Sequence, residues 1–175
     1  MGFYVVPDTS KIGVSSPIKE SNSKYEAPSG TVIIGRKHDG DENGNTEYQY
    51  APLRVDPNDA ANAGASIALS NATWTDSQKQ SDFDYQAPSG WVIIGRKHDG
   101  DENGQTSYKI AQVIVQGSSI VKSVNGMTSG AIKESSGIWY SAPALGTMME
   151  VMTGNKHKGD ENGDTWYYSN LLYKE

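Results

Sequence analysis

The chain contains the stretch YEAPSGTVIIGRKHDGDENGNTEY at Tyr25–Tyr48, and this stretch decides how the whole molecule is organised. It returns as YQAPSGWVIIGRKHDGDENGQTSY at Tyr85–Tyr108, with changes at only four positions. A third copy, at Tyr140–Tyr167, keeps Tyr-x-Ala-Pro, the histidine, Gly-Asp-Glu-Asn-Gly, the threonine and the last tyrosine. Self-similarity at a fixed period indicates a repeat architecture. We therefore expect one domain, residues 1–175, built from three tandem units at approximately 1–57, 58–116 and 117–175.

The composition favours an all-β fold. The chain has 19 glycines, seven prolines and ten tyrosines, which are typical of short strands and turns. No segment keeps an apolar stripe at helical spacing, and the nearest candidate, Ala60–Leu69, is interrupted by Gly64. In each unit the polar loop is predicted to be the turn of a hairpin. The paired strands are expected at Thr31–His38 with Thr46–Val55, from Trp91 to the second loop with Thr106–Val115, and at Thr147–His157 with Thr165–Tyr173.

Two further strands are expected ahead of each hairpin. The first begins the unit, at Phe3–Pro7, Ser66–Trp74 and Ser118–Met127, and the second ends in Tyr-x-Ala-Pro, at Lys24–Pro28, Phe83–Pro88 and Ile138–Pro143. The first and third units also share Ile-Lys-Glu-Ser, at Ile18–Ser21 and Ile132–Ser135. About twelve strands in three units predict a pseudo-threefold symmetric domain that is β-prism-like, with a β-trefoil-like barrel as the alternative.

The strand before each loop is expected to deliver polar side chains to the loop end. Successive side chains of a strand point to opposite faces. Val32 and Ile34 are therefore predicted to point inward, on the same face as Arg36 and His38.

The repeated loop is the candidate binding site. Carboxylates and a carboxamide can bond neighbouring sugar hydroxyls, and an aromatic ring offers an apolar face to a pyranose. We therefore predict one carbohydrate site in each unit, with no catalytic residue, no metal ion and no cofactor. The candidate ligand-binding residues are His38, Asp39, Asp41, Glu42, Asn43, Gly44 and Tyr48; His98, Asp99, Asp101, Glu102, Asn103, Gly104 and Tyr108; and His157, Gly159, Asp160, Glu161, Asn162, Gly163 and Tyr167. Trp166 is a further candidate for the stacking face.

The same loop has a purely structural interpretation. Aspartate, asparagine and glycine are ordinary turn formers, and a recent duplication alone would preserve a repeated turn. The third unit favours function, because it keeps His157 and Gly159–Gly163 while it has diverged almost everywhere else.

Metal binding is the competing alternative. Asp39-x-Asp41-x-Asn43-Gly44 matches the start of a calcium loop, and the second unit repeats the match. The acid at the twelfth position is replaced by Tyr50 and Ile110, and Lys158 stands at the first ligand position of the third loop. We therefore expect binding to survive chelation of calcium. Zinc or iron held by the three histidines would require these side chains to converge.

Other classes of function have less support in the sequence. The net charge of −6 argues against a nucleic-acid partner, which calls for a basic face. No segment is long and apolar enough to insert into a membrane. An enzyme is not expected, because consecutive Asp41 and Glu42 point apart and the sequence has no nucleophile elbow, no His-Glu-x-x-His motif and no phosphate-binding loop followed by a helix.

At the level of architecture, the chain resembles microbial and plant lectins built from three tandem β units, each of which carries a glycan site. It lacks the Gln-x-Trp signature of ricin-type trefoils and the Gly-x-x-x-Asp signature of jacalin-type prisms, so no binding residue is carried over. The resemblance implies a multivalent lectin or agglutinin whose partners are glycans on cell surfaces or glycoproteins. A host-recognition adhesin or a toxin or phage receptor-binding module is the alternative, and a calcium-binding β repeat protein is another.

Location and assembly are only loosely constrained. Glycan partners predict an extracellular or cell-surface-directed protein. No signal peptide is visible, which is compatible with cytoplasmic storage before release. The sequence is compatible with a homo-oligomer.

Overall fold

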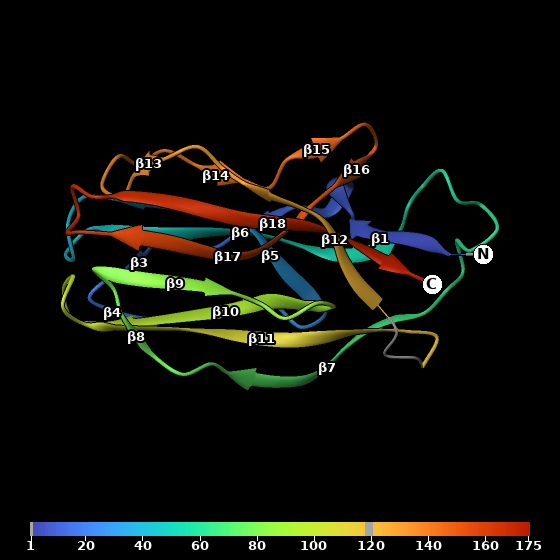
Figure 1. The fold of residues 1–175 in the computed structure, drawn as a ribbon, viewed down its shortest axis with the longest axis horizontal. Coiled ribbons are helices and arrows are strands. Elements are labelled where there is room, and N and C mark those ends of the chain that lie inside the picture. The colour runs from blue at the N-terminus through green and yellow to red at the C-terminus, as the bar shows by residue number, and fades with distance from the viewer. Residues whose placement is uncertain (1, 118–120) are drawn as a thin grey trace.

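The computed structural model describes residues 2–117 and 121–175 and has an all-β fold, as predicted (Figure 1). Within these residues there is no α-helix, and η1 at Thr9–Lys11 is a short 3-10 turn. The longer strands are β1 Phe3–Pro7, β4 Asn22–Glu26, β5 Thr31–Asp39, β6 Asn45–Val55, β7 Ile67–Trp74, β9 Asp82–Gln86, β10 Trp91–Asp99, β11 Gln105–Val115, β12 Val121–Thr128, β17 Val151–Lys158 and β18 Asp164–Lys174. The two-residue strands are β2 Gly13–Val14, β3 Ile18–Lys19, β8 Gln78–Lys79, β13 Ile132–Lys133, β14 Tyr140–Ser141, β15 Ala144–Leu145 and β16 Met148–Met149.

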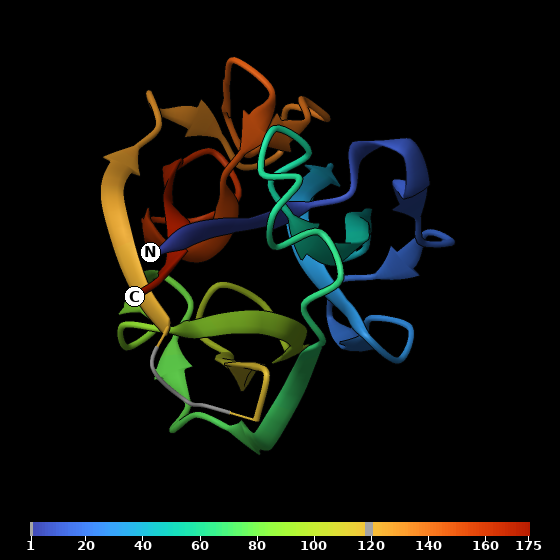
Figure 2. The same ribbon diagram turned by 90° about the vertical axis from the view of Figure 1, so that its right-hand side faces the viewer.

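The three predicted hairpins are confirmed. β5 pairs with β6, β10 with β11 and β17 with β18, all antiparallel, and in each pair the polar loop is the turn. The hairpins run along the length of the molecule, so that the three loops lie together at one end and both termini at the other (Figure 1). Seen from the end that carries the termini, the three hairpins surround a common centre (Figure 2).

Strands pass between neighbouring units. β4 of the first unit pairs with β10 of the second, β9 of the second with β17 of the third, and β14 of the third with β5 of the first. Glycine in Gly-x-Lys-His permits this close approach, because a Cβ added at Gly154 would lie 1.9 Å from the carbonyl oxygen of Tyr85.

These pairings define three faces. The first face is formed by β14, β5, β6 and the β2–β3 segment, the second by β4, β10, β11 and the β7–β8 segment, and the third by β9, β17, β18 and the β12–β13 segment. β1 lies between β6 and β18 and joins the first and third faces into one sheet. Among the described residues, none forms a helix that could span a membrane.

The interior is layered from the termini towards the loops. An aliphatic cluster near the termini contains Val5, Val32 and Leu172, and a second cluster contains the tyrosines of the repeated motif. In this second cluster Tyr25 stacks on Tyr48 with ring centroids 4.4 Å apart, and Tyr140 stacks on Tyr167 at 4.2 Å. Polar residues fill the space between the tyrosines and the loops.

Val32 and Ile34 point into the interior as predicted, since both are 0% exposed, but the prediction that they share a face with Arg36 and His38 is wrong. A β-bulge shifts the register between Ile33 and Gly35, and it recurs in the other two hairpins. Arg36 and His38 therefore share their face with Ile33, whereas Val32 and Ile34 pack in the aliphatic cluster. The extra residue of a bulge reverses the alternation that follows it.

The predicted long strand Thr147–His157 of the third unit is also wrong. Its inserted residues form a small β15–β16 hairpin, and β17 begins only at Val151. The expected strand at Ser118–Met127 is present from Val121 onward, and its first three residues lie outside the described part of the chain.

Candidate functional site

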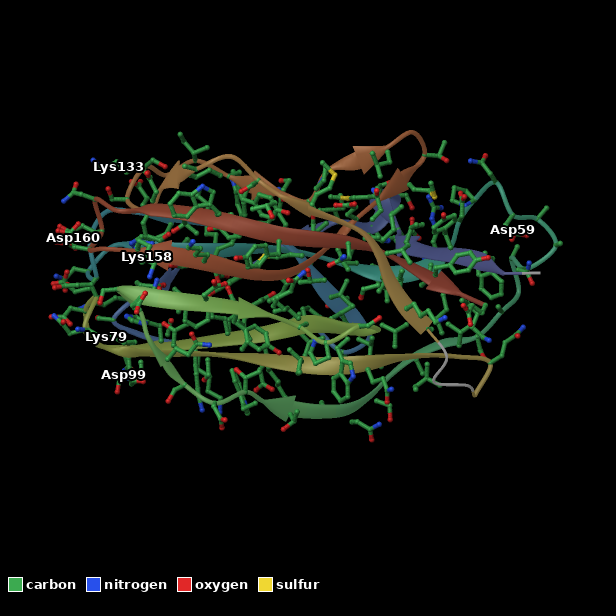
Figure 3. All side chains as sticks on the ribbon, in the orientation of Figure 1. Asp59, Lys79, Asp99, Lys133, Lys158 and Asp160 are labelled. Atoms are coloured by element: carbon green, nitrogen blue, oxygen red, sulfur yellow. The ribbon has the colours of Figure 1, made fainter. Side chains whose placement is uncertain are left out.

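The three polar loops converge at one end of the molecule, where Asp99, Lys158 and Asp160 are all found (Figure 3). Backbone hydrogen bonds tie each loop to the preceding unit. Gly100 N donates to Ser21 O at 2.8 Å, Gly159 N to Ser81 O at 2.9 Å and Gly40 N to Ser135 O at 3.2 Å. The contacts run from the first unit to the second, then to the third and back to the first. The loops therefore form one common surface instead of three separate ones.

Within each loop, the aspartate of Gly-Asp-Glu-Asn-Gly closes a turn. Asn43 N donates to Asp41 Oδ1 at 2.8 Å, and Asn43 Nδ2 donates to Glu42 Oε1 at 3.0 Å. The second and third loops make the same two bonds. The aspartates and asparagines are exposed and the glutamates half-buried, but each of these groups has already formed a local bond. The turn-forming interpretation therefore explains part of the motif.

The histidines are buried beneath the loops. Their Nδ1 atoms lie 2.9, 2.7 and 2.7 Å from the Oγ1 atoms of Thr46, Thr106 and Thr165. Thr46 donates in turn to Glu20, Thr106 to Gln80 at 2.5 Å and Thr165 to Glu134 at 2.5 Å. The three histidines are at most 4% exposed, so contact with a ligand outside the loops is not available to them. Their predicted role as ligand-binding residues is corrected to one of internal support.

Beneath the histidines lies a buried charged layer. Glu20 Oε1 lies 2.7 Å from Arg96 Nη1 and 3.3 Å from Arg36 Nη2, and Arg36 Nη2 lies 2.7 Å from Glu134 Oε1. Each glutamate thus contacts the arginine of the following unit. Gln80 and Asn155 occupy the corresponding two positions between the second and third units. Three-fold repetition would give three glutamates and three arginines, but one of each is replaced by a neutral residue. The layer therefore contains two buried carboxylates, Glu20 and Glu134, and two buried guanidinium groups, Arg36 and Arg96.

The ion pairs set the protonation of the layer. Burial alone would raise the pKa of Glu134, but the Arg36 guanidinium outweighs it and lowers the pKa to about 2. Burial likewise opposes ionisation of Glu20, and Arg96 and Arg36 hold its pKa well below the usual range. Burial also lowers the pKa of His38 and His98, and each neighbouring arginine lowers it further.

These pKa shifts predict that acid destabilises the protein in two stages. An unfolded histidine has a pKa of about 6.5 and an unfolded glutamate about 4.3. Since all four groups bind protons less readily in the folded chain, stability is full above these values and is lost as the pH falls. We expect the melting temperature to fall first below about pH 6.5, through His38 and His98, and again below about pH 4.3, through Glu20 and Glu134.

Circular dichroism melting curves between neutral pH and pH 3 measure both stages. A variant with His38→Gln and His98→Gln is the control for the first stage, because it retains the glutamates. The difference in melting temperature between wild type and this variant should shrink as the pH falls from 7 to 5. A difference that grows over this interval would contradict the assignment.

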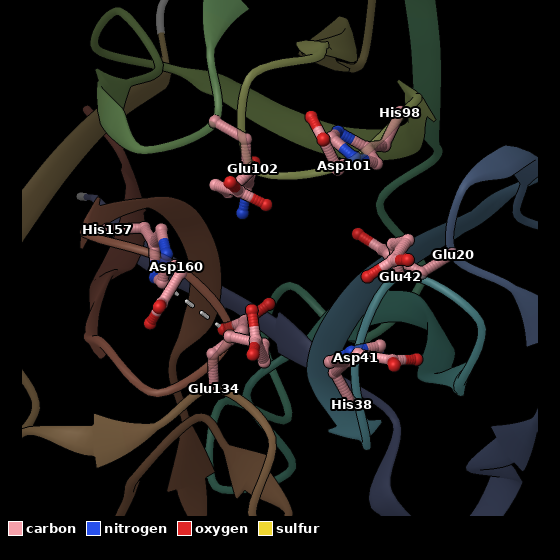
Figure 4. Close-up of a pocket in the computed structure, with 12 residues that line it drawn as sticks. Glu20, His38, Asp41, Glu42, His98, Asp101, Glu102, Glu134, His157 and Asp160 are labelled. Atoms are coloured by element: carbon pink, nitrogen blue, oxygen red, sulfur yellow. Dashed lines mark ion pairs between the residues drawn. The ribbon is translucent and has the colours of Figure 1, made fainter.

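A small pocket lies where the loops and the histidines meet (Figure 4). It is lined by Glu20, Gln80 and Glu134, by His38, His98 and His157, and by Asp41, Glu42, Asp101, Glu102, Asp160 and Glu161. Its cavity volume is about 30 Å³, enough for one or two water molecules. A monosaccharide does not fit inside. A glycan that binds here must therefore contact the outer side of the loops.

The histidines converge on this pocket but are not arranged as metal ligands. His98 Nε2 lies 3.0 Å from Gly100 O and His157 Nε2 lies 2.9 Å from Gly159 O, so both rings have polar partners on each side. Across residues 2–117 and 121–175, no set of three or more histidine or acidic side chains is placed to hold a metal ion.

The motif tyrosines do not provide a stacking face. Tyr48 and Tyr108 are 0% exposed and Tyr167 is 3% exposed. They are buried because their hydroxyls complete the charged layer. Arg96 donates to Tyr48, Arg36 donates to Tyr167, and Tyr108 donates to Asn155. The prediction that these three rings bind sugar is wrong.

Partly exposed tryptophans lie instead on the outer side of each face. The indole of Trp139 lies 5.1 Å from Lys37 Nζ, that of Trp74 lies 4.7 Å from Lys97 Nζ and that of Trp166 lies 5.7 Å from Lys156 Nζ. The three lysines are equivalent members of Gly-x-Lys-His. The tryptophans stand at three different positions of the repeat, just before β14, at the end of β7 and within β18. From the sequence, only Trp166 is a candidate for the stacking face. Trp74 and Trp139 are distant from their loops in the sequence, and only the pairing of the strands places them beside the equivalent lysines.

No family model matches the chain, and the comparisons with curated proteins and with solved structures gave no match.

Proposed function

We propose that the protein is a multivalent carbohydrate-binding protein, a lectin, with glycan sites on the outer sides of its three faces beside the polar loops. The observation that carries the proposal is the tryptophan beside each loop-proximal lysine. Duplication would copy a tryptophan to the same position of each unit. Here three different positions supply it, which favours a shared requirement for an aromatic ring at that place.

The polar loop lies within reach of each ring. In a strand, Lys37 and Asp39 point to the same side and are about 7 Å apart. The same spacing separates Lys97 from Asp99, and Lys156 from Lys158. An indole for the apolar side of a pyranose and charged groups for its hydroxyls are then available together. Asp41 and Glu42, with their counterparts in the other loops, form the shared acidic surface between the three sites.

The proposed architecture is a pseudo-threefold β-prism-like domain. The exchange of β4, β9 and β14 around the three hairpins supports it, because each unit gives one strand and receives one. Three sites on one rigid body would raise the avidity for a glycan-coated surface above the affinity of any single site. Adhesion to such a surface is the biological setting that this arrangement fits.

Removing the tryptophans one at a time tests the proposal. On a glycan array, the wild type should bind a defined set of glycans. Trp74→Leu, Trp139→Leu and Trp166→Leu should each weaken the binding of the immobilised protein to a soluble glycan by roughly three- to tenfold at the affected site. Agglutination of glycan-bearing cells should be lost more steeply as the substitutions are combined.

Trp91→Leu is the matched control, because Trp91 begins β10 at the end far from the loops. It should leave glycan binding unchanged. If the folded triple variant binds as well as the wild type, or if the wild type binds no glycan at all, the proposal is wrong.

A further inference from the structure

We propose that the groove on the second face binds an acidic sugar, a pyranose that carries a carboxylate. This inference rests on the proposed lectin function and assigns a ligand class to one of its three sites. The groove has a volume of about 560 Å³, within the range of small-ligand sites. It runs across β4, β10 and β11 and is bordered by the Thr75–Ser77 segment.

The groove is open because of one small residue. Ser107 on β11 pairs with Lys97 on β10. In the first face the corresponding residue is Glu47, paired with Lys37, and in the third it is Trp166, paired with Lys156. Both of these larger side chains cover the outer side of their strands. Serine is too short to extend across the outer side of its strand in the same way.

The same change leaves Lys97 without a counter-ion. Glu47 makes an ion pair with Lys37 at 2.5 Å, and Ser107 offers Lys97 no such partner. On its other side Lys97 pairs with Lys24, whereas the equivalent Lys156 pairs with Asp84. Like charges opposite each other on neighbouring strands are destabilising. None of the ion pairs found among the described residues involves Lys24 or Lys97, so a bound anion would relieve their repulsion.

Two buried hydroxyls in the groove have no partner. Ser23 is 3% exposed and Ser107 is 1% exposed, and the Oγ atom of each lacks a hydrogen bond. A buried polar group without a partner costs about 1–3 kcal/mol. Both serines line the groove, as do Asn22 and Gln105 and the carboxylates Asp76 and Asp99, neither of which forms an ion pair with Lys24 or Lys97. The exposed amides of Asn22 and Gln105 can bond the hydroxyls of a sugar, while the two lysines hold its carboxylate. The serine hydroxyls are covered in the unliganded chain, and a shift of the covering side chains on binding would give them the partners that they lack.

Trp74 lies next to the groove, in contact with the two lysines that line it. Its ring lies 5.8 Å from Lys24 Nζ and 4.7 Å from Lys97 Nζ, so that the aromatic surface and the two cations are adjacent. A neutral sugar would use the ring and the hydroxyls only. An acidic sugar would use all three kinds of group, which is why the groove is expected to prefer it.

Calorimetric titration of the full chain with a matched pair of ligands tests the preference. Methyl β-glucuronide and methyl β-glucoside differ only in the carboxylate. We expect the glucuronide to bind at least about tenfold more tightly at low salt, and the preference to weaken as salt is added. N-acetylneuraminic acid is the second acidic probe, and it distinguishes a sialic-acid site from a uronic-acid site by which acid binds more tightly.

Two variants locate the site. Lys24→Gln with Lys97→Gln should abolish the preference and leave the weaker neutral binding. Ser107→Trp should block both ligands, because it fills the groove with the residue that the third unit carries at this position. Glu47→Trp makes the same change on the first face and should leave the preference intact. Shifts of the Trp74 indole N–H signal in the wild type, assigned with Trp74→Phe, report binding even if Ser107→Trp does not fold.

The inference is overturned if the wild type shows no acidic preference while Trp139 and Trp166 still support neutral glycan binding, an outcome that leaves the lectin proposal standing. It is also overturned if the lysine variant keeps the preference, or if the Trp74 signal does not move with the glucuronide. Absence of binding to every glycan would overturn both proposals together.

Discussion

Replacing Arg36 by asparagine should lower the free energy of unfolding by about 3–5 kcal/mol, because removal of one partner leaves a buried charge uncompensated. Glu134 has its 2.7 Å contact with Arg36. Without Arg36 it would retain the hydrogen bond from Thr165 at 2.5 Å and the ring of His157, whose Nδ1 is 3.9 Å away, but no arginine. Glu20 would still have Arg96. For a domain of this size, about 2–4 °C is lost per kcal/mol, so the melting temperature should fall by roughly 10 °C.

The contact between the second and third units suggests a second substitution that should restore the lost stability. At this contact, Gln80 and Asn155 already replace a glutamate and an arginine. There Tyr108 donates its hydroxyl hydrogen to the asparagine. Adding Glu134→Gln to Arg36→Asn would copy this neutral arrangement, with Tyr167 in the role of Tyr108. We expect the double variant to recover most of the loss, with a coupling of about 2 kcal/mol in a double-mutant cycle. Additive single effects would show that the pair is not coupled.

The hairpins could be predicted from the sequence because their information is local. A β-rich strand, a loop with two glycines and a returning strand lie within 25 residues of one another, and the structure places these elements almost where the pattern does. The bulge after Ile33 was not predictable from alternation. It inserts a residue without any change of composition, yet it decides which side chains reach the interior.

The exchange of strands between units is a non-local property. Tyr-x-Ala-Pro marks the end of a strand but does not specify the hairpin that receives it. The tyrosines consequently looked available for stacking, whereas the neighbouring unit covers them. Tyr25 illustrates this, since β4 carries it to the second face while its ring stacks on Tyr48 of the first.

The charged layer did leave a signal in the sequence. Ile-Lys-Glu-Ser is shared by the first and third units, and the second has Gln80 in place of the glutamate. The third unit has Asn155 in place of the arginine of Gly-Arg-Lys-His. Two replacements that cancel in charge suggest a buried pair. Only the structure shows that these two positions lie at the same contact, the one between the second and third units.

The last glycine of the loop motif should be as sensitive as the buried charges. A Cβ added at Gly104 would lie 1.7 Å from the carbonyl oxygen of Asp99, and Gly44 and Gly163 have the same contact at 1.8 and 1.9 Å. The obstacle is backbone, so the loop itself would have to open. That would break the bonds from Gly104 N to Asp101 O and from Gln80 N to Gly104 O.

We therefore expect Gly104→Ala to cost about 3 kcal/mol, and to lower the melting temperature by roughly 6–12 °C. Gly64→Ala is the matched control, because a Cβ there has no atom within 4 Å and should change stability by less than about 0.5 kcal/mol. A large loss at Gly104 would show that the turn of the second loop requires a glycine at this position. If Gly104→Ala has the same melting temperature as the wild type, the turn does not explain the repeated glycine. Contact with a ligand then becomes the remaining physical reason for its presence.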